Sequence, residues 1–139
     1  MKNKLSLTLA DAKKMMASCQ KAAEENNWNV SIAIVDEGGY PICLERLDGA
    51  GLPSAEIAIL KARTAALSRV PTKALEDVAK DRPATTTFPG RLPVQGGLPI
   101  LYQGSCVGGI GVSGVKSHED EIVASAGLAV LDSATANER

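Results

Sequence analysis

Aromatic side chains are scarce in this chain: Phe, Trp and Tyr together make up 3% of its 139 residues. The bulk of the core must therefore come from aliphatic side chains and alanine, which favours close packing of helices over small side chains. Long hydrophobic runs are also missing, since no window approaches the roughly 18 apolar residues that a membrane helix needs. Polar residues interrupt the segment after Lys2 and Lys4, so we interpret the N-terminus as mature protein and expect no membrane partner.

The chain has no excess of charge of one sign. Fifteen basic and sixteen acidic residues give a net charge of −1, and the basic residues are scattered along the sequence. This pattern excludes the basic surface that nucleic acid requires. Three cysteines, Cys19, Cys43 and Cys106, are an odd number without metal-ligand spacing. We therefore expect reduced thiols, no metal site and a cytoplasmic protein.

Hydrophobic periodicity predicts an α+β protein with a single domain over residues 1–139. Thr8 and Asp11 indicate the start of the first helix, and the strand 30–35 is apolar on both faces, which predicts a sheet covered by helices on both sides. On the last helix the predicted buried face consists of Ile122, Ala126, Ala129, Val130 and Ser133. The predicted elements are helix 9–26, strands 30–35 and 40–47, helices 54–70 and 72–80, an irregular loop 81–94, strands 98–103 and 106–113, and helix 117–135.

Glycine is concentrated between residues 96 and 114. So many glycines indicate that something approaches the backbone closely or that the backbone bends sharply. One interpretation is a strand kept bare so that a helix can pack against it. The other is a ligand site, in which backbone N–H groups at Gly96, Gly97, Ser113 and Gly114 receive a carboxylate beside the start of the last helix.

Several charged residues are candidates for acid–base chemistry. A lysine beside a carboxylate can clamp an anion or, with a lowered pKa, act as a base, which makes Lys61, Asp120 and Glu56 the catalytic candidates. The alternative for each is a structural ion pair or a helix-terminal charge. The candidate substrate-binding residues, besides the glycine segment, are Arg46, Phe88, His118 and Glu119.

Five segments of the chain carry a family resemblance: Val35-Asp36-Glu37-Gly38-Gly39, Arg46-Leu47-Asp48-Gly49-Ala50, Ile57-Ala58-Ile59-Leu60-Lys61-Ala62-Arg63-Thr64-Ala65, Gly96-Gly97-Leu98-Pro99-Ile100, and Gly109-Ile110-Gly111-Val112-Ser113-Gly114 with Asp120-Glu121. Together they resemble the GlcG/HbpS family, also called haem-degrading or DUF336, which includes the C-terminal domain of PduO-type proteins and NahX-like proteins. The resemblance covers nearly the whole chain. It implies a profilin-like three-layer α/β/α sandwich with a five-stranded antiparallel sheet, assembled into homo-oligomers such as dimers, tetramers or octamers.

Members of this family that bind or degrade haem, and members encoded beside catabolic enzymes, imply different functions for the chain. We expect an accessory catabolic enzyme of hydrolase, deaminase or tautomerase type that acts on a small organic acid, imine or enamine without a cofactor. The alternatives are a haem-binding, haem-degrading or haem-sequestering protein, and a non-catalytic oligomeric scaffold. Met15, Met16 and Cys19 are potential haem ligands, but they lie on the apolar stripe of the first helix, where core positions are expected.

Overall fold

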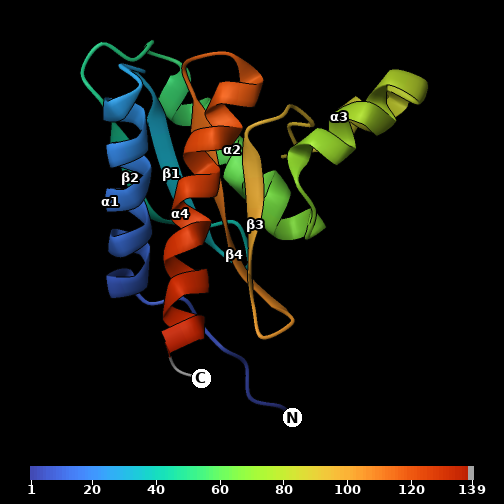
Figure 1. The fold of residues 1–139 in the computed structure, drawn as a ribbon. Helices are drawn as coiled ribbons and strands as arrows, with labels where there is room; N and C mark the ends of the chain where they lie inside the picture. The colour runs from blue at the N-terminus through green and yellow to red at the C-terminus, as the bar shows by residue number, and fades with distance from the viewer. Residues whose placement is uncertain (138–139) are drawn as a thin grey trace.

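The computed structural model describes the backbone of residues 1–137 and the side chains of residues 1–131. The strand order in the antiparallel sheet is β2-β1-β4-β3. Helices α1 and α4 lie side by side on one face of the sheet, α2 covers the other face, and α3 projects away from it (Figure 1). The elements are α1 Leu9–Glu25, β1 Ser31–Asp36, β2 Pro41–Arg46, α2 Ser54–Ser68, α3 Thr72–Asp81, the 3₁₀ helix η1 Pro83–Thr87, β3 Gly97–Tyr102, β4 Ser105–Ser113 and α4 Ser117–Asn137.

Burial on β1 confirms that the sheet is covered on both faces. Ile32 and Ile34 belong to the larger cluster with the side chains of α1 and α4, whereas Ala33 and Val35 pack with alanines of α2. Successive side chains of a strand point to opposite faces, so the two clusters lie on the two sides of one sheet. The predicted start of α1 is also confirmed, because Thr8 and Asp11 form a reciprocal capping box.

The sheet has four strands in the described part of the chain, not the five that the family resemblance implied. The segment between α3 and β3 contains Pro83, Pro89 and Pro93, which lack the N–H that a strand ladder needs. It forms η1 and an irregular stretch instead. The helical layers on either side of the sheet agree with the expected sandwich.

The predicted buried face of α4 was wrong in part, since Val130 packs against the core and Ala126 is half-buried. Ile122 is 51% exposed and Ala129 is exposed, whereas Val123, Ala124 and Gly127 are buried. A Cβ at Gly127 would lie 2.7 Å from the Sγ of Cys19, so α1 approaches α4 at this glycine. The stripe that faces the core consists of Val123, Ala124 and Leu128, with Val130 and Leu131 beside it, so α4 is rotated relative to the predicted face. Ser133 lies outside the described side chains.

Candidate functional site

Lys61 and Asp120 form an ion pair inside the protein. The Nζ of Lys61 donates to Oδ2 of Asp120 at 3.1 Å and to the carbonyl oxygen of Val112 at 3.1 Å. The lysine comes from α2 and the aspartate from the first turn of α4, and the two side chains are 4% and 2% exposed. The pair therefore links the helix on one face of the sheet to a helix on the other face.

Burial dominates the electrostatics of Asp120. Removal from water raises the pKa of its carboxyl group above the ordinary value, and the nearby Lys61 ammonium opposes this rise. Its second oxygen, Oδ1, accepts a hydrogen bond from the Val115 N–H at 3.1 Å. Both carboxyl oxygens are thus engaged within the chain, and neither residue presents an open face to a solute.

Gly96 provides the space for the lysine head group. Its φ is +132°, and a Cβ at this position would lie 2.8 Å from Nζ of Lys61 and 2.9 Å from the Val112 carbonyl oxygen. Only glycine combines this backbone conformation with such a close approach. Gly96 is therefore a neighbour of Lys61 and, through it, of Asp120, two of the three catalytic candidates.

Other glycines of this segment are covered by α2. A Cβ at Gly97 would collide with the Lys61 carbonyl oxygen, one at Gly109 with that of Ala62, and one at Gly111 with that of Ala58. The N–H of Gly97 donates to Oγ1 of Thr72 at 2.9 Å. Of the two interpretations left open, helix packing accounts for these three glycines, and the Gly97 N–H is not free to receive a carboxylate.

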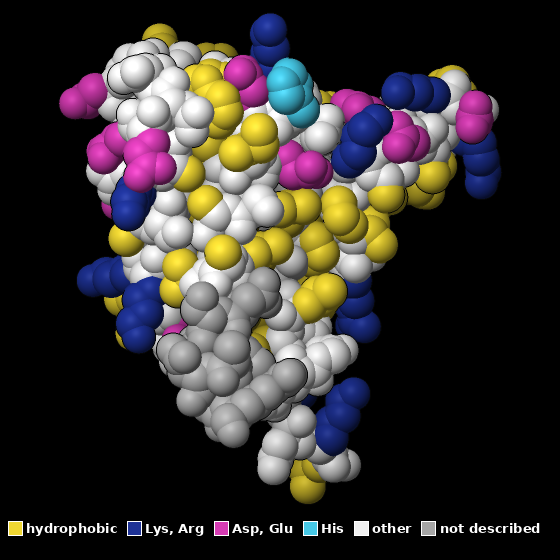
Figure 2. All heavy atoms as spheres, viewed as in Figure 1, with side chains coloured by type: hydrophobic (Ala, Val, Ile, Leu, Met, Phe, Trp, Pro, Cys, Tyr) yellow, Lys and Arg dark blue, Asp and Glu magenta, His cyan; other side chains and the backbone are white. Residues whose placement is uncertain are grey.

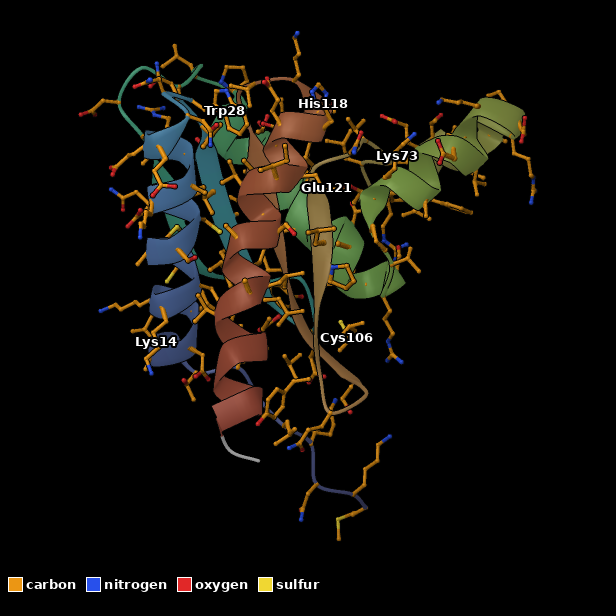
Figure 3. The ribbon with its side chains drawn as sticks, viewed as in Figure 1. Lys14, Trp28, Lys73, Cys106, His118 and Glu121 are labelled. Atoms are coloured by element: carbon orange, nitrogen blue, oxygen red, sulfur yellow. The ribbon has the colours of Figure 1, made fainter. Side chains whose placement is uncertain are left out.

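The remaining predicted site residues are dispersed. Glu56 and Arg46 are exposed, and within the described residues no hydrogen bond or ion pair joins either of them to Lys61 or Asp120. Glu119 accepts a hydrogen bond from the Lys116 N–H at 3.2 Å, which is a helix-capping role. His118 lies exposed at the start of α4 (Figure 3).

Phe88, Ser113 and Gly114 also lie apart from a common ligand site. Phe88 is 59% exposed and lines a cavity of about 190 Å³ beside α3. Ser113 ends β4 opposite Ser31, and a Cβ at Gly114 would lie 2.5 Å from the Asn29 carbonyl oxygen. The chain thus lies close to the Cβ position of Gly114, although this glycine is exposed.

A groove that the sequence analysis missed runs between α1 and the edge strand β2. Its volume is about 480 Å³, and a second cavity of about 430 Å³ shares Gln20 with it and extends it to Trp28 and Leu47. The groove brings residues of α1 together with residues of β2, and the second cavity is lined mostly by polar side chains, so no local sequence signal marks either of them. The groove is lined by Leu9, Lys13, Met16, Ala17, Gln20, Ile42, Cys43, Leu44 and Glu45.

Comparison with known proteins places the chain in one family. The family model described as haem degrading protein HbpS-like matches residues 7–129. Protein GlcG of Escherichia coli strain K12 is 41% identical over 114 residues, which cover 81% of this chain and 85% of that protein.

Solved structures agree with this assignment. The crystal structure of a double mutant of Streptomyces reticuli HbpS has a TM-score of 0.89 and 39% identity, covering 94% of this chain and 90% of that one. The crystal structure of a PduOC:heme complex has a TM-score of 0.83 and 25% identity, covering 90% and 94%. The chain therefore belongs to the HbpS-like family.

Proposed function

We propose that this protein binds haem. The observation that carries the proposal is the similarity of the chain, along most of its length, to a domain crystallised as a haem complex. The family description, haem degrading protein HbpS-like, supports the same function. Haem binding, the alternative in our sequence analysis, thus has more support than the catabolic enzyme that we expected.

The groove between α1 and β2 is the proposed haem site. A haem needs apolar walls for its macrocycle, cations for its propionates and a donor atom for its iron. Leu9 and Ile42 supply apolar surface, Lys13 supplies a cation, and the half-buried Cys43 supplies a thiol. When bound, the haem would supply the iron chemistry, and these residues would hold and orient it.

Cys19 and Met15 are unsuited to contact the haem. Both are buried, and burial raises the pKa of the Cys19 thiol to about 12, so this sulfur stays protonated inside the core. His118 lies at the start of α4 and lines neither the groove nor its extension. Of the three potential haem ligands on the first helix, Met15, Met16 and Cys19, only Met16 lines the groove.

Titration of the purified protein with hemin tests the proposal. We expect a saturable, sharpened Soret band in the parent protein. Leu44→Asp places a charge in the groove and should lower the affinity for hemin at least tenfold. Cys43→Ser should change the position of the band if the thiol is the iron ligand. Cys106→Ser and His118→Ala are the matched controls and should bind as the parent does. Nonspecific broadening alone, or equal binding by Leu44→Asp, would contradict the proposal.

The acid–base alternative has less support because Lys61 and Asp120 are 3% and 2% exposed and already bonded to each other. A small-molecule substrate could reach them only after the chain opened.

The homo-oligomer remains a prediction, which light scattering coupled to gel filtration would test. Exposed apolar side chains such as Leu101 and Ile122 support it, and Figure 2 shows hydrophobic side chains gathered on one face of the molecule.

A further inference from the structure

Arg63 lies enclosed between two turns on the side of α2. A Cβ at Gly39 in the β1–β2 turn would lie 2.5 Å from Cγ of Arg63, and one at Gly90 would lie 3.9 Å from Nε. The guanidinium carbon sits over the Tyr40 ring, 5.7 Å from its centroid. The alkyl part of the arginine is therefore packed on one turn, and the guanidinium stands between an aromatic ring and the Gly90 loop.

The guanidinium has no acceptor within the described residues. Its Nε is buried without a hydrogen-bond partner, and no carboxylate of the described chain forms an ion pair with Arg63. A buried charged donor without an acceptor is costly, because it loses hydration and gains nothing in return. A buried donor of this kind calls for an explanation, and a water molecule, an ion or a ligand that pairs with it is one.

The surroundings define the chemistry of that acceptor. The Tyr40 ring covers one face of the guanidinium, so an acceptor must approach in its plane, where Nε and an Nη present a fork of two N–H groups. Two oxygens of one carboxylate or phosphate group match such a fork. Nε itself is buried, whereas Tyr40 is 64% exposed and Arg63 as a residue is only half-buried, so a solute that reaches this edge must displace the atoms that cover Nε.

We propose that Arg63 anchors a binding site for a small oxyanion, with a carboxylate or phosphate group held in the plane of the guanidinium. The N–H groups of Gly90 and Arg91, which have no acceptor in the described chain, lie in the loop beside it. The Arg63 site is separate from the groove, because α1 and α2 cover opposite faces of the sheet. It therefore does not depend on haem binding.

Nuclear magnetic resonance of the Arg63 Nε–Hε group tests the proposal on the intact protein. Inorganic phosphate and acetate are titrated separately against sodium chloride at equal ionic strength, which distinguishes a phosphate ligand from a carboxylate ligand. We expect a saturable shift of the Hε resonance with at least one of the two. Arg63→Lys keeps the charge but removes the fork, so binding should weaken about tenfold. Arg46→Lys, at an exposed arginine of β2, should leave binding unchanged.

Three results would overturn the proposal: no saturable shift with either anion, an equal shift with chloride, or a shift that follows protein concentration without added anion. The last result would assign the acceptor to a second copy of the chain. If circular dichroism shows that Arg63→Lys does not fold, the anion titrations of the parent protein and of Tyr40→Ala are compared instead. In Tyr40→Ala the acceptor is no longer confined to the plane, and we expect weaker anion binding.

Discussion

The Nζ of Lys61 and the Oδ2 of Asp120 lie 3.1 Å apart with almost no access to water. Each charge is held in the interior only by its partner and by one backbone group, Val112 for the lysine and Val115 for the aspartate. A buried pair of this kind gains little over an apolar replacement of both residues, but removal of one partner leaves an uncompensated charge. A single substitution at either residue should therefore weaken the packing of α2, β4 and α4 against one another.

Lys61→Met should destabilise the protein strongly. The substitution removes the cation while Asp120 remains buried, and loss of one member of a buried pair costs about 3–5 kcal/mol. Urea unfolding followed by circular dichroism measures the change in the free energy of unfolding. Lys21→Met, at the exposed pair Lys21–Glu25, is the control and should leave that free energy nearly unchanged.

The double variant Lys61→Met with Asp120→Asn should recover part of this loss. Asparagine is neutral and can still accept from the Val115 N–H, so the cost of the buried charge disappears. The sum of the two single changes should then exceed the change in the double variant. Strict additivity would show that the two side chains do not interact.

The destabilisation by Lys61→Met should grow as the pH rises. Burial raises the pKa of Asp120 above its ordinary 3.8, so the folded chain holds this proton to a higher pH than the unfolded chain. The stability that this carboxyl contributes is complete below 3.8 and is lost as the pH rises through the folded value. Without the ammonium the folded pKa rises further, which widens this window.

Urea unfolding of the parent and of Lys61→Met at several pH values from about 5 to about 8 measures this effect. The difference in free energy should be smallest at the acid end. A difference that stays constant, or that grows toward acid, would contradict the assignment to Asp120. The double variant with Asp120→Asn serves as the control and should show no such pH dependence.

Gly111→Ala should destabilise the protein through the contact between α2 and β4. A Cβ at Gly111 would collide with the Ala58 carbonyl oxygen and lie 3.0 Å from Cα of Ala62, so the helix must move away from the sheet. Overpacking of this kind costs about 1–3 kcal/mol, measurable by thermal unfolding. Gly51→Ala is the matched control, since a Cβ there meets only Pro53 at 3.9 Å. Equal effects of the two substitutions would refute the packing role.

The three thiols should differ in reactivity. Cys19 is 0% exposed and its pKa is raised to about 12, whereas Cys43 and Cys106 are partly exposed. Thiolate is the reactive form, so Cys19 should react with a disulfide reagent only after unfolding in urea. The titration should give two reactive thiols in the native protein and a third in urea. Rapid reaction of Cys19 in the native state would contradict its place in the core.

Local sequence signals predicted the helices and strands well because their causes are local. The Thr8–Asp11 cap and the β-branched run of β1 act over a few residues, and both elements form where they were expected. More than one apolar stripe fits the sequence of α4, and only the tertiary structure shows that Val123, Ala124 and Leu128 face the core while Ile122 does not. The predicted number of strands was wrong because it was inferred from the family resemblance. The prolines between α3 and β3 disfavour a fifth strand in this chain.

The sequence by itself determined the element order and the family, since each depends on residue type and spacing. Only the tertiary structure decided what approaches the glycines: the backbone of α2 fills the space over Gly97, Gly109 and Gly111. It also decided that Lys61 bonds to Asp120 and that a groove opens between α1 and β2. These are contacts between segments distant in sequence, and no local pattern specifies which two surfaces meet.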